Sequence, residues 1–259
     1  MTSPDSHSSG FLATAPDALR YEYLSLDPDD AGMKLANLIE PNSRVLDVGC
    51  GTGVITNMIR CQRSASIIGI EPDAERVHMA VARGLDVHMG ILSSDFIEQH
   101  GPFDYIVFAD VLEHLFNPAE IVVMARAGLK PGGSVVASIP NVAHWFVRTD
   151  LLCGRFDYQD CGIMDATHLR WFTRRTIREF FERLGFQITA LDCTVNINLP
   201  DYQRRYPWRK MSPAFRRKLV GKLAAWSPAL FGCQHIVRAT LSNNGVRQAH
   251  LEKRPDTVR

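Results

Sequence analysis

The feature that most constrains this chain is a run of glycines directly after a short apolar segment. Val45 to Val48 is apolar except for Asp47, and Gly49, Gly51 and Gly53 follow at alternate positions. Glycine accepts left-handed backbone conformations and lets the main chain approach a ligand closely. A strand, a glycine turn and a helix in this order are typical of α/β proteins that bind a ligand at the turn.

Short apolar strands alternate with amphipathic helices along most of the sequence. We predict helices over Asp29 to Ile39, Val54 to Arg60, Asp73 to Arg83, Pro118 to Ala127 and Thr173 to Leu184. We predict strands over Val45 to Val48, Ser66 to Ile70, Asp86 to Met89, Tyr105 to Ala109, Ser134 to Ile139, Phe186 to Val195 and Cys233 to Leu241. Strands that are joined through helices are parallel, and such sheets carry helices on both faces. The pattern therefore predicts an α/β fold with a doubly wound, mostly parallel sheet.

Length and composition bound the organisation of the chain. Its 259 residues suit one large α/β domain. We predict a disordered tail over 1–17, a polar tail over 243–259, and one domain over 18–242 with insertions at 141–172 and 196–228. The net charge of +1 gives no global reason to expect a nucleic-acid partner.

The cysteines and the apolar runs indicate in which cellular compartment the protein is expected. No CxxC pair or zinc-like spacing occurs among Cys50, Cys61, Cys153, Cys161, Cys193 and Cys233. Free thiols in a reducing cytosol are therefore expected. No apolar run approaches the ~20 residues of a membrane span, and Met1 to Gly10 lacks the apolar core of a signal peptide. We expect a soluble, cytoplasmic protein that acts on a small molecule.

The acids near the glycine run favour a particular kind of ligand. The spacing of the glycines is not the GxGxxG of dinucleotide sites, and Asp47 would repel a pyrophosphate. It would instead favour a ligand with a cationic end, such as S-adenosylmethionine, which carries an ammonium and a sulfonium. Glu71 closes the second strand, where a carboxylate can accept the hydroxyls of a ribose.

Four ordered motifs carry a resemblance to a known family. They are Val45 to Gly53, Gly69 to Asp73, Phe103 to Val107 with Glu113 to Leu115, and Leu129 to Gly133. They resemble the successive motifs of class I (Rossmann-like) S-adenosylmethionine-dependent methyltransferases, over about residues 40–195. The resemblance implies a seven-stranded sheet whose last strand is antiparallel, so that Cys233 to Leu241 pairs with Phe186 to Val195, and an insertion on the acceptor side.

The resemblance also implies a cofactor site. Its residues would be Asp47, Gly49, Gly51, Gly53, Glu71, Ile91 and Asp110. The loop and Asp110 would face the methionine portion, and Glu71 would hold the ribose. The chain departs from the family after its third strand, where an acid commonly reads the adenine amino group. Here Gly90 precedes Ile91, which is expected to pack on the adenine face, and Asp95 is the candidate substitute acid.

A second group of acids and histidines suggests a metal site. Asp110, Glu113 and His114 have the i, i+3, i+4 spacing that places side chains on one face of a helical turn. With His168 they could hold a divalent cation such as Mg²⁺ or Mn²⁺. The alternative is that Glu113 and His114 support the cofactor loop. The Glu-His pair is widespread in this family, whereas metal use is restricted.

The candidate acceptor site lies in the 141–172 insertion. This stretch resembles an insertion in bacterial methyltransferases of small hydroxylated molecules, including sugars and quinones. His168 follows Thr167 in a context that looks like the acceptor-site histidine of quinone O-methyltransferases, so it is the candidate general base. His144 is the second candidate, and both could be structural. The candidate substrate-binding residues are Trp145, Arg148, Arg155, Arg170 and Trp171.

The charge of the insertions leaves the acceptor open. Residues 141–222 hold fifteen Lys or Arg against eight Asp or Glu, which would attract an anionic substrate or form a solvated face. Phe215, Leu219, Leu223, Ala224 and Trp226 have helical spacing opposite a basic face. This element is expected to be a lid or a homodimer contact, with an anionic membrane surface as the third possibility.

The leading functional hypothesis is O-methylation of a small hydroxylated metabolite, and bacterial secondary metabolism is the expected context. A small amine is the alternative acceptor. A nucleobase N-methyltransferase commonly has Asn/Asp-Pro-Pro-Tyr after the fourth strand, and here that place reads Ala109 to Leu112. A non-catalytic partner protein with the same fold is disfavoured by the intact glycine loop and Glu71.

Overall fold

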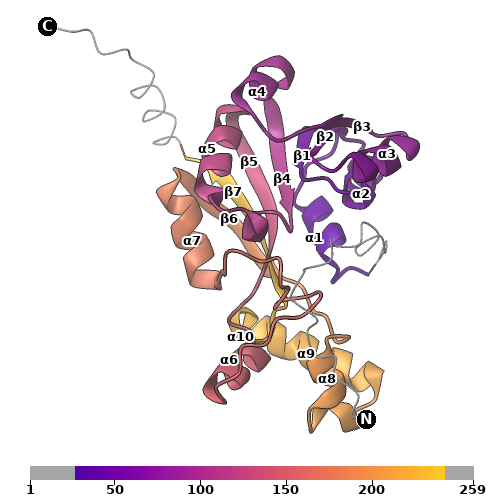
Figure 1. Ribbon diagram of the computed structural model, residues 1–259, viewed down its shortest axis with the longest axis vertical. Coiled ribbons are helices and arrows are strands. Elements are labelled where there is room, and N and C mark those ends of the chain that lie inside the picture. Colours follow the sequence, from indigo (N-terminus) through magenta and orange to yellow (C-terminus); the bar gives the residue numbers. More distant parts are fainter. Residues whose placement is uncertain (1–26, 243–259) are drawn as a thin grey trace, which may run out of the picture.

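The computed structural model describes residues 27–242, which form one seven-stranded sheet with helices on both faces (Figure 1). The strands are β1 (Arg44–Val48), β2 (Ser66–Glu71), β3 (Asp86–Met89), β4 (Phe103–Ala109), β5 (Leu129–Pro140), β6 (Phe186–Cys193) and β7 (Gln234–Leu241). The helices are α1 (Ala31–Asn37), α2 (Val54–Arg63), α3 (Ala74–Ala82), α4 (Ser94–His100), α5 (Pro118–Ala127), α6 (Trp145–Leu152), α7 (Arg174–Arg183), α8 (Pro200–Arg204), α9 (Pro213–Trp226) and α10 (Pro228–Phe231), with 3₁₀ turns η1 (Leu112–His114) and η2 (Trp208–Lys210). The predicted tails at 1–17 and 243–259 lie outside the described residues.

The topology confirms the predicted doubly wound sheet. The strand order is β3-β2-β1-β4-β5-β7-β6, and β1 to β5 pair in parallel. β7 is antiparallel to both β5 and β6, so it lies inside the sheet and not at its edge. The strand order reverses between β1 and β4, and ligands of such sheets bind beyond the carboxyl ends at that point. The glycine loop after β1 and Asp110 after β4 therefore flank the expected site.

Two apolar clusters hold the helices against the sheet. On one face, Ile97 of α4, Val122 of α5 and Phe181 of α7 pack with β-strand residues such as Phe108 and Val237. On the other face, residues of α1 and α2 such as Leu35 and Ile59 pack with Val45 and Val107. The strands are buried on both faces, which explains their nearly continuous apolar runs.

A separate helical lobe lies at the carboxyl end of β5. Figure 1 shows α6, α8, α9 and α10 together at the end of the molecule opposite to α4. A third apolar cluster holds this lobe and includes Phe146, Met164, Tyr202 and Val220. No helix was predicted within the 141–172 insertion, whereas its first part forms α6. The sequence shows no clear helical periodicity here, because both faces of α6 carry apolar or aromatic side chains.

Two further elements differ from the predicted ones. α4 was not predicted, because Phe96 and Ile97 are the apolar residues of a very short helix that Ser93 caps. The Leu129 to Gly133 motif, which lies outside the predicted strand, is a bulge inside β5 opposite Asp104, whose carboxylate pairs with Lys130 at 2.8 Å. This motif lies at the amino end of the strands and so contributes to the sheet rather than to the cofactor site.

The three glycines of the loop, Gly49, Gly51 and Gly53, all have left-handed backbone. Gly51 has φ +55°, and a Cβ atom built there would meet no atom within 4 Å. Gly53 has φ +80°, and a Cβ atom there would lie 2.3 Å from Leu85 Cδ1 and 3.1 Å from Ala80 Cβ. Gly53 is therefore required for both its conformation and the close packing of the loop on α3.

This contrast predicts unequal effects of alanine at two glycines. Gly51→Ala should lower the free energy of unfolding by about 1 kcal/mol through backbone strain. Gly53→Ala should lower it by about 3 kcal/mol, because the overlap with Leu85 adds to the same strain. Urea unfolding of both variants and of the wild type measures the difference. Equal losses in the two variants would contradict this account of Gly53.

Candidate active site

A buried carboxyl group lies directly beneath the glycine loop. Asp47 is on β1, and its Oδ2 accepts a hydrogen bond from Thr56 Oγ1 at 2.6 Å, while Oδ1 has no hydrogen-bond partner in the described structure. Burial raises the pKa of Asp47 to about 7, the Thr56 hydrogen bond opposes that rise, and the Glu71 charge adds to it. A cationic ligand beside this group would stabilise its ionised form.

Glu71 connects the end of β2 to the loop. Its Oε2 accepts a hydrogen bond from the Gly51 amide at 2.9 Å, and its Oε1 accepts one from the Asp73 amide at 3.1 Å. The structure thus brings together Asp47, Glu71 and the three glycines that the sequence analysis singled out. Thr56, which bonds Asp47, was not identified from sequence, because a threonine within a helix gives no signal of its own.

Two exposed apolar side chains lie at the end of β3 and just after it. Ile91 is 73% exposed and Met89 is 68% exposed. Both side chains are available to a flat apolar ligand at the carboxyl edge of the sheet. Asp95 lies exposed in the first turn of α4, where a negative charge favours the helix amino end.

Asp110 follows β4 with a left-handed backbone, φ +53°. Its Oδ1 accepts hydrogen bonds from Ser138 Oγ at 3.0 Å and from Gln234 Nε2 at 2.8 Å, which hold the carboxylate toward β5 and β7. Burial raises its pKa, although both hydrogen bonds oppose the rise. Neither partner could be identified from sequence, because Gln234 lies 124 residues away.

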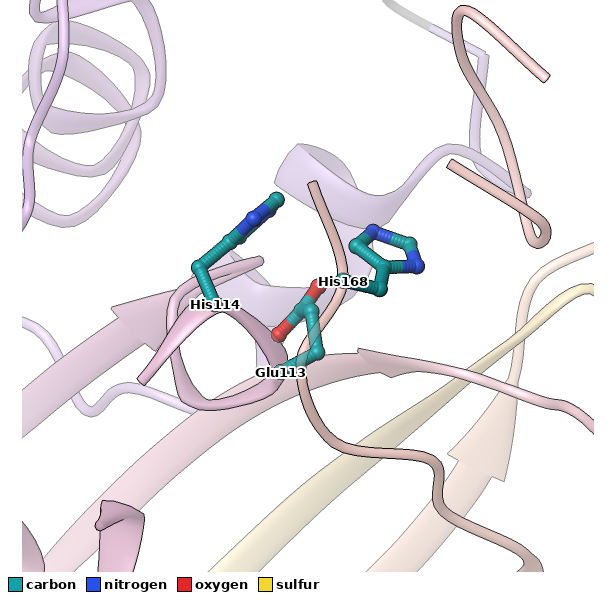
Figure 2. Close-up of side chains that lie close together, drawn as sticks. All are labelled: Glu113, His114 and His168. Atoms are coloured by element: carbon teal, nitrogen blue, oxygen red, sulfur yellow. The ribbon is translucent and has the colours of Figure 1, made fainter. Parts of the chain in front are cut away.

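Glu113, His114 and His168 form a compact cluster (Figure 2). One carboxylate oxygen and one ring nitrogen from each histidine all lie within 4.8 Å of one another. Figure 2 shows the Glu113 carboxylate between the two imidazoles. Three of the four predicted metal candidates are therefore together, whereas Asp110 is not part of this group.

Main-chain carbonyls orient both imidazoles. His114 Nδ1 lies 3.2 Å from the carbonyl oxygen of Thr167, and His168 Nδ1 lies 3.1 Å from that of Ile163. Because a carbonyl oxygen only accepts, each Nδ1 carries the proton and each Nε2 carries a lone pair in the neutral ring. This arrangement leaves both histidines suited to accept a proton or to bind a cation through Nε2.

Glu113 is the unusual member of the cluster. It is 1% exposed, and neither carboxylate oxygen has a hydrogen-bond partner in the described structure. Burial raises its pKa well above the ordinary value, and the charges of Asp110 and Asp165 add to that rise. A buried carboxylate without a partner is costly unless a cation or a donor meets it. The donor set therefore fits a bound divalent cation.

The second half of the 141–172 insertion is fixed to η1. The amides of Leu169 and Arg170 both donate to the carbonyl oxygen of Glu113, at 2.8 and 2.9 Å. Asp165 accepts from the Thr167 amide and hydroxyl, and that hydroxyl lies 3.2 Å from His114 Nδ1. No role was predicted for the Asp165 and Thr167 side chains, although Asp-x-Thr is a common turn pattern.

Aromatic rings extend from His168 to a cavity in the helical lobe. Trp171 lies 5.5 Å from the His168 ring, and Phe156 lies 5.7 Å from Trp171, between ring centroids. Phe156 and Arg155 line a cavity of about 380 Å³ between α6, the following loop and α8. Of the predicted substrate-binding residues, Trp171 lies beside the cluster and Arg155 lies at this cavity.

The arginines of the insertion are largely engaged within the protein. Arg155 pairs with Asp150 at 2.6 Å, Arg170 donates to the carbonyl oxygen of Phe116, and Arg148 donates to that of Ala143. Of these three, only Arg155 is paired with an acid in the described part of the chain, and main-chain carbonyl oxygens hold the guanidinium groups of Arg148 and Arg170. This weakens the argument from charge for an anionic acceptor.

His144 and Trp145 belong to the interior of the lobe. His144 Nε2 lies 3.4 Å from the Tyr202 hydroxyl, to which Trp145 Nε1 donates at 3.0 Å. Burial lowers the pKa of His144 to about 3, so its ring is neutral at physiological pH. The structure does not place His144 in the cluster with Glu113 and His168.

We predict that His144→Asn makes stability less sensitive to acid. The folded protein has a pKa of about 3 for this group against 6.5 ordinarily, so the unfolded chain binds the proton first and stability falls as the pH drops below 6.5. Between about pH 7 and pH 4 this costs the wild type about 3 kcal/mol. Urea unfolding at both pH values tests this, and equal losses in variant and wild type would contradict it.

No helix among residues 27–242 is long and apolar enough to cross a membrane. All six cysteines are free thiols.

Residues 20–191 match a family model described as a methyltransferase domain. A ubiquinone biosynthesis O-methyltransferase of Xanthomonas axonopodis pv. citri is 32% identical over 133 residues, covering 49% of this chain and 51% of that protein. One of the same name from Xylella fastidiosa is 34% identical over 105 residues, covering 38% of this chain and 42% of that protein.

A solved structure shares the fold. The crystal structure of an S-adenosylmethionine-dependent methyltransferase from Archaeoglobus fulgidus matches with a TM-score of 0.53 at 17% identity, over 76% of this chain and 85% of that one. The chain spans about half or less of the length of the curated relatives, whereas the family model covers well over half of the chain. The protein therefore belongs to the class I S-adenosylmethionine-dependent methyltransferases.

Proposed function

We propose that this methyltransferase methylates a hydroxyl oxygen of a small metabolite. The observation that carries the proposal is the cluster of Glu113, His114 and His168 beside the switch point of the sheet. This cluster follows β4, on the same edge as the glycine loop, so the sulfonium methyl group and an acceptor oxygen would meet there. The relatives named as ubiquinone O-methyltransferases support this choice.

The cofactor would be bound by the residues at the ends of β1, β2 and β3. Asp47 and the glycine loop would contact the cationic methionine end, with Asp110 on its other side. Glu71 would accept hydrogen bonds from the ribose hydroxyls, and Ile91 would pack on the adenine. Two observations support this: Glu71 already bonds the loop amide of Gly51, and Ile91 is exposed at the same edge.

His168 is the proposed general base. The cofactor would supply the methyl group to the acceptor oxygen, with its sulfur as the leaving group, and His168 Nε2 would accept the hydroxyl proton. The bond from Nδ1 to the Ile163 carbonyl supports this role, because it fixes the tautomer that can accept a proton. Trp171 and Phe156 would exclude water and stack on a flat acceptor ring, as in a quinol.

A divalent cation at the cluster is the alternative to a His168 base, because an Nε2 that coordinates a cation cannot also accept the hydroxyl proton. Glu113, His114 and His168 would hold it, and two imidazoles with one carboxylate suit Zn²⁺ or Mn²⁺ better than Mg²⁺. Such a cation would lower the pKa of a hydroxyl bound to it. Asp165 and Thr167 would orient His114 for this purpose through the Thr167 hydroxyl.

We predict that His168→Gln lowers kcat by about 10² to 10⁴ while the affinity for S-adenosylmethionine changes little. Glutamine keeps a polar side chain of similar reach but cannot accept the proton. Release of S-adenosylhomocysteine with catechol and quinol acceptors measures kcat, and calorimetry measures cofactor affinity. His144→Gln is the matched control and should retain turnover. Full activity of the His168 variant would rule out a general-base role.

Cation binding is tested separately. Calorimetric titration of the protein with Zn²⁺ or Mn²⁺ should show one site, and Glu113→Gln should weaken that site by at least about tenfold because the charged ligand is lost. Asp110→Asn should leave it nearly unchanged, since that carboxylate is held by Ser138 and Gln234. Wild-type protein that binds neither ion, and whose turnover is unaffected by EDTA, would remove the cation from the proposal without affecting the role of His168 as a base.

A further inference from the structure

Helix α9 presents two different faces. Arg216, Val220 and Ala224 recur every four residues and are buried against the helical lobe. On the other side, Phe215, Lys218, Lys222 and Trp226 follow one another at spacings of three, four and four, and all four are exposed. Residues at such spacings lie in one row along a helix. We call these four residues the α9 row.

The α9 row is apolar at both ends and cationic between them. Phe215 is 56% exposed and Trp226 is 78% exposed, although large aromatic side chains are usually buried. Lys218 and Lys222 form no ion pair with any residue in the described part of the chain. The neighbouring Arg217 differs, because it pairs with Asp27 and Asp29.

The surroundings of the row are strongly basic. From Tyr202 to Gln234 the sequence has eight Lys or Arg and no Asp or Glu. Arg204, Arg209 and Lys210, on α8 and η2, are also exposed and form no ion pair among the described residues. The chain has a net charge of only +1, so this concentration of positive charge is local to the lobe.

The helical lobe carries further exposed apolar side chains. Tyr206, just after α8, is 77% exposed, and Leu152, at the end of α6, is 87% exposed. The end of α6 is joined to α8 by the ion pair between Asp150 and Arg205. Figure 1 shows α6, α8 and α9 at the end of the molecule away from α4, so this surface is not covered by the sheet.

We propose that the α9 row binds the surface of an anionic lipid bilayer. Lysines attract acidic headgroups, and aromatic side chains insert at the boundary between headgroups and acyl chains, so the helix would lie in the plane of the surface. Nucleic acid would also attract the lysines, but a duplex offers no apolar region for Phe215 and Trp226 at the two ends of the row. The charge and the apolar side chains together favour the bilayer.

Co-sedimentation of the full chain with vesicles tests this proposal. The probes are vesicles with about 30% phosphatidylglycerol in phosphatidylcholine, and vesicles of phosphatidylcholine alone. The protein should sediment with the first and not with the second, and about 0.5 M salt should release it. Methyl transfer is not measured, so the outcome is independent of the proposed O-methylation.

Two variants separate the contributions of charge and apolar surface. A lysine near an anionic surface is worth about fivefold in binding, so Lys218→Gln with Lys222→Gln should weaken vesicle binding roughly 25-fold and reduce its salt dependence. Trp226→Ser should weaken binding and leave the salt dependence unchanged. Arg178→Gln with Arg183→Gln, exposed on α7, changes the net charge equally and should have no effect. Unchanged affinity for S-adenosylmethionine shows that each variant is folded.

Four results would overturn the proposal. They are absence of sedimentation with the anionic vesicles, equal binding by the lysine variant and the wild type, an equal loss in the α7 control, and binding of duplex DNA in place of vesicles. A dimer that forms in solution and is lost in the lysine variant, with no vesicle binding, would instead assign the α9 row to a contact between copies of this chain.

Discussion

The carbonyl oxygen of Glu113 is the point on which the acceptor side of this protein depends. It accepts the amides of Leu169 and Arg170, and those two bonds attach a long insertion to the turn that follows β4. Because η1 closely follows β4, these two bonds fix the position of the insertion relative to the sheet. His168 and Thr167 lie immediately before the attached residues, and they are thereby brought to His114 and to the buried carboxylate of Glu113 itself.

The cofactor side of the site lies at the carboxyl ends of the strands, where the strand order reverses between β1 and β4. Asp47 and the glycine loop end β1, Glu71 ends β2, and Asp110 ends β4, so three separate segments converge at one edge. The antiparallel β7 contributes as well, since Gln234 at its start holds Asp110. Asp110, which the sequence spacing groups with Glu113 and His114, therefore bonds Ser138 and Gln234 instead.

Compensation of charge differs between the two insertions. Arg148, Arg155 and Arg170 are neutralised or bonded within the protein, whereas Lys218 and Lys222 on α9 meet no acid in the described structure. The same excess of basic residues therefore has two consequences. Near the cluster it stabilises the fold of the insertion, and on α9 it remains on the surface together with Phe215 and Trp226.

The sequence by itself determined the sheet, the order of its elements and the residues around the glycine loop. Alternating apolar strands and the glycine spacing are local patterns, and the sheet edge brings Asp47 and Glu71 together wherever such strands are parallel. The resemblance already grouped His168 with Glu113 and His114, whereas only the tertiary structure shows how they meet and that Asp110 lies apart from them. His144 packs against Tyr202, and His168 is carried to η1 by hydrogen bonds over long sequence separations. The tertiary structure also decided that the predicted helix at 215–226 leaves its aromatic ends exposed, because Val220 and Ala224 are the residues that the lobe buries.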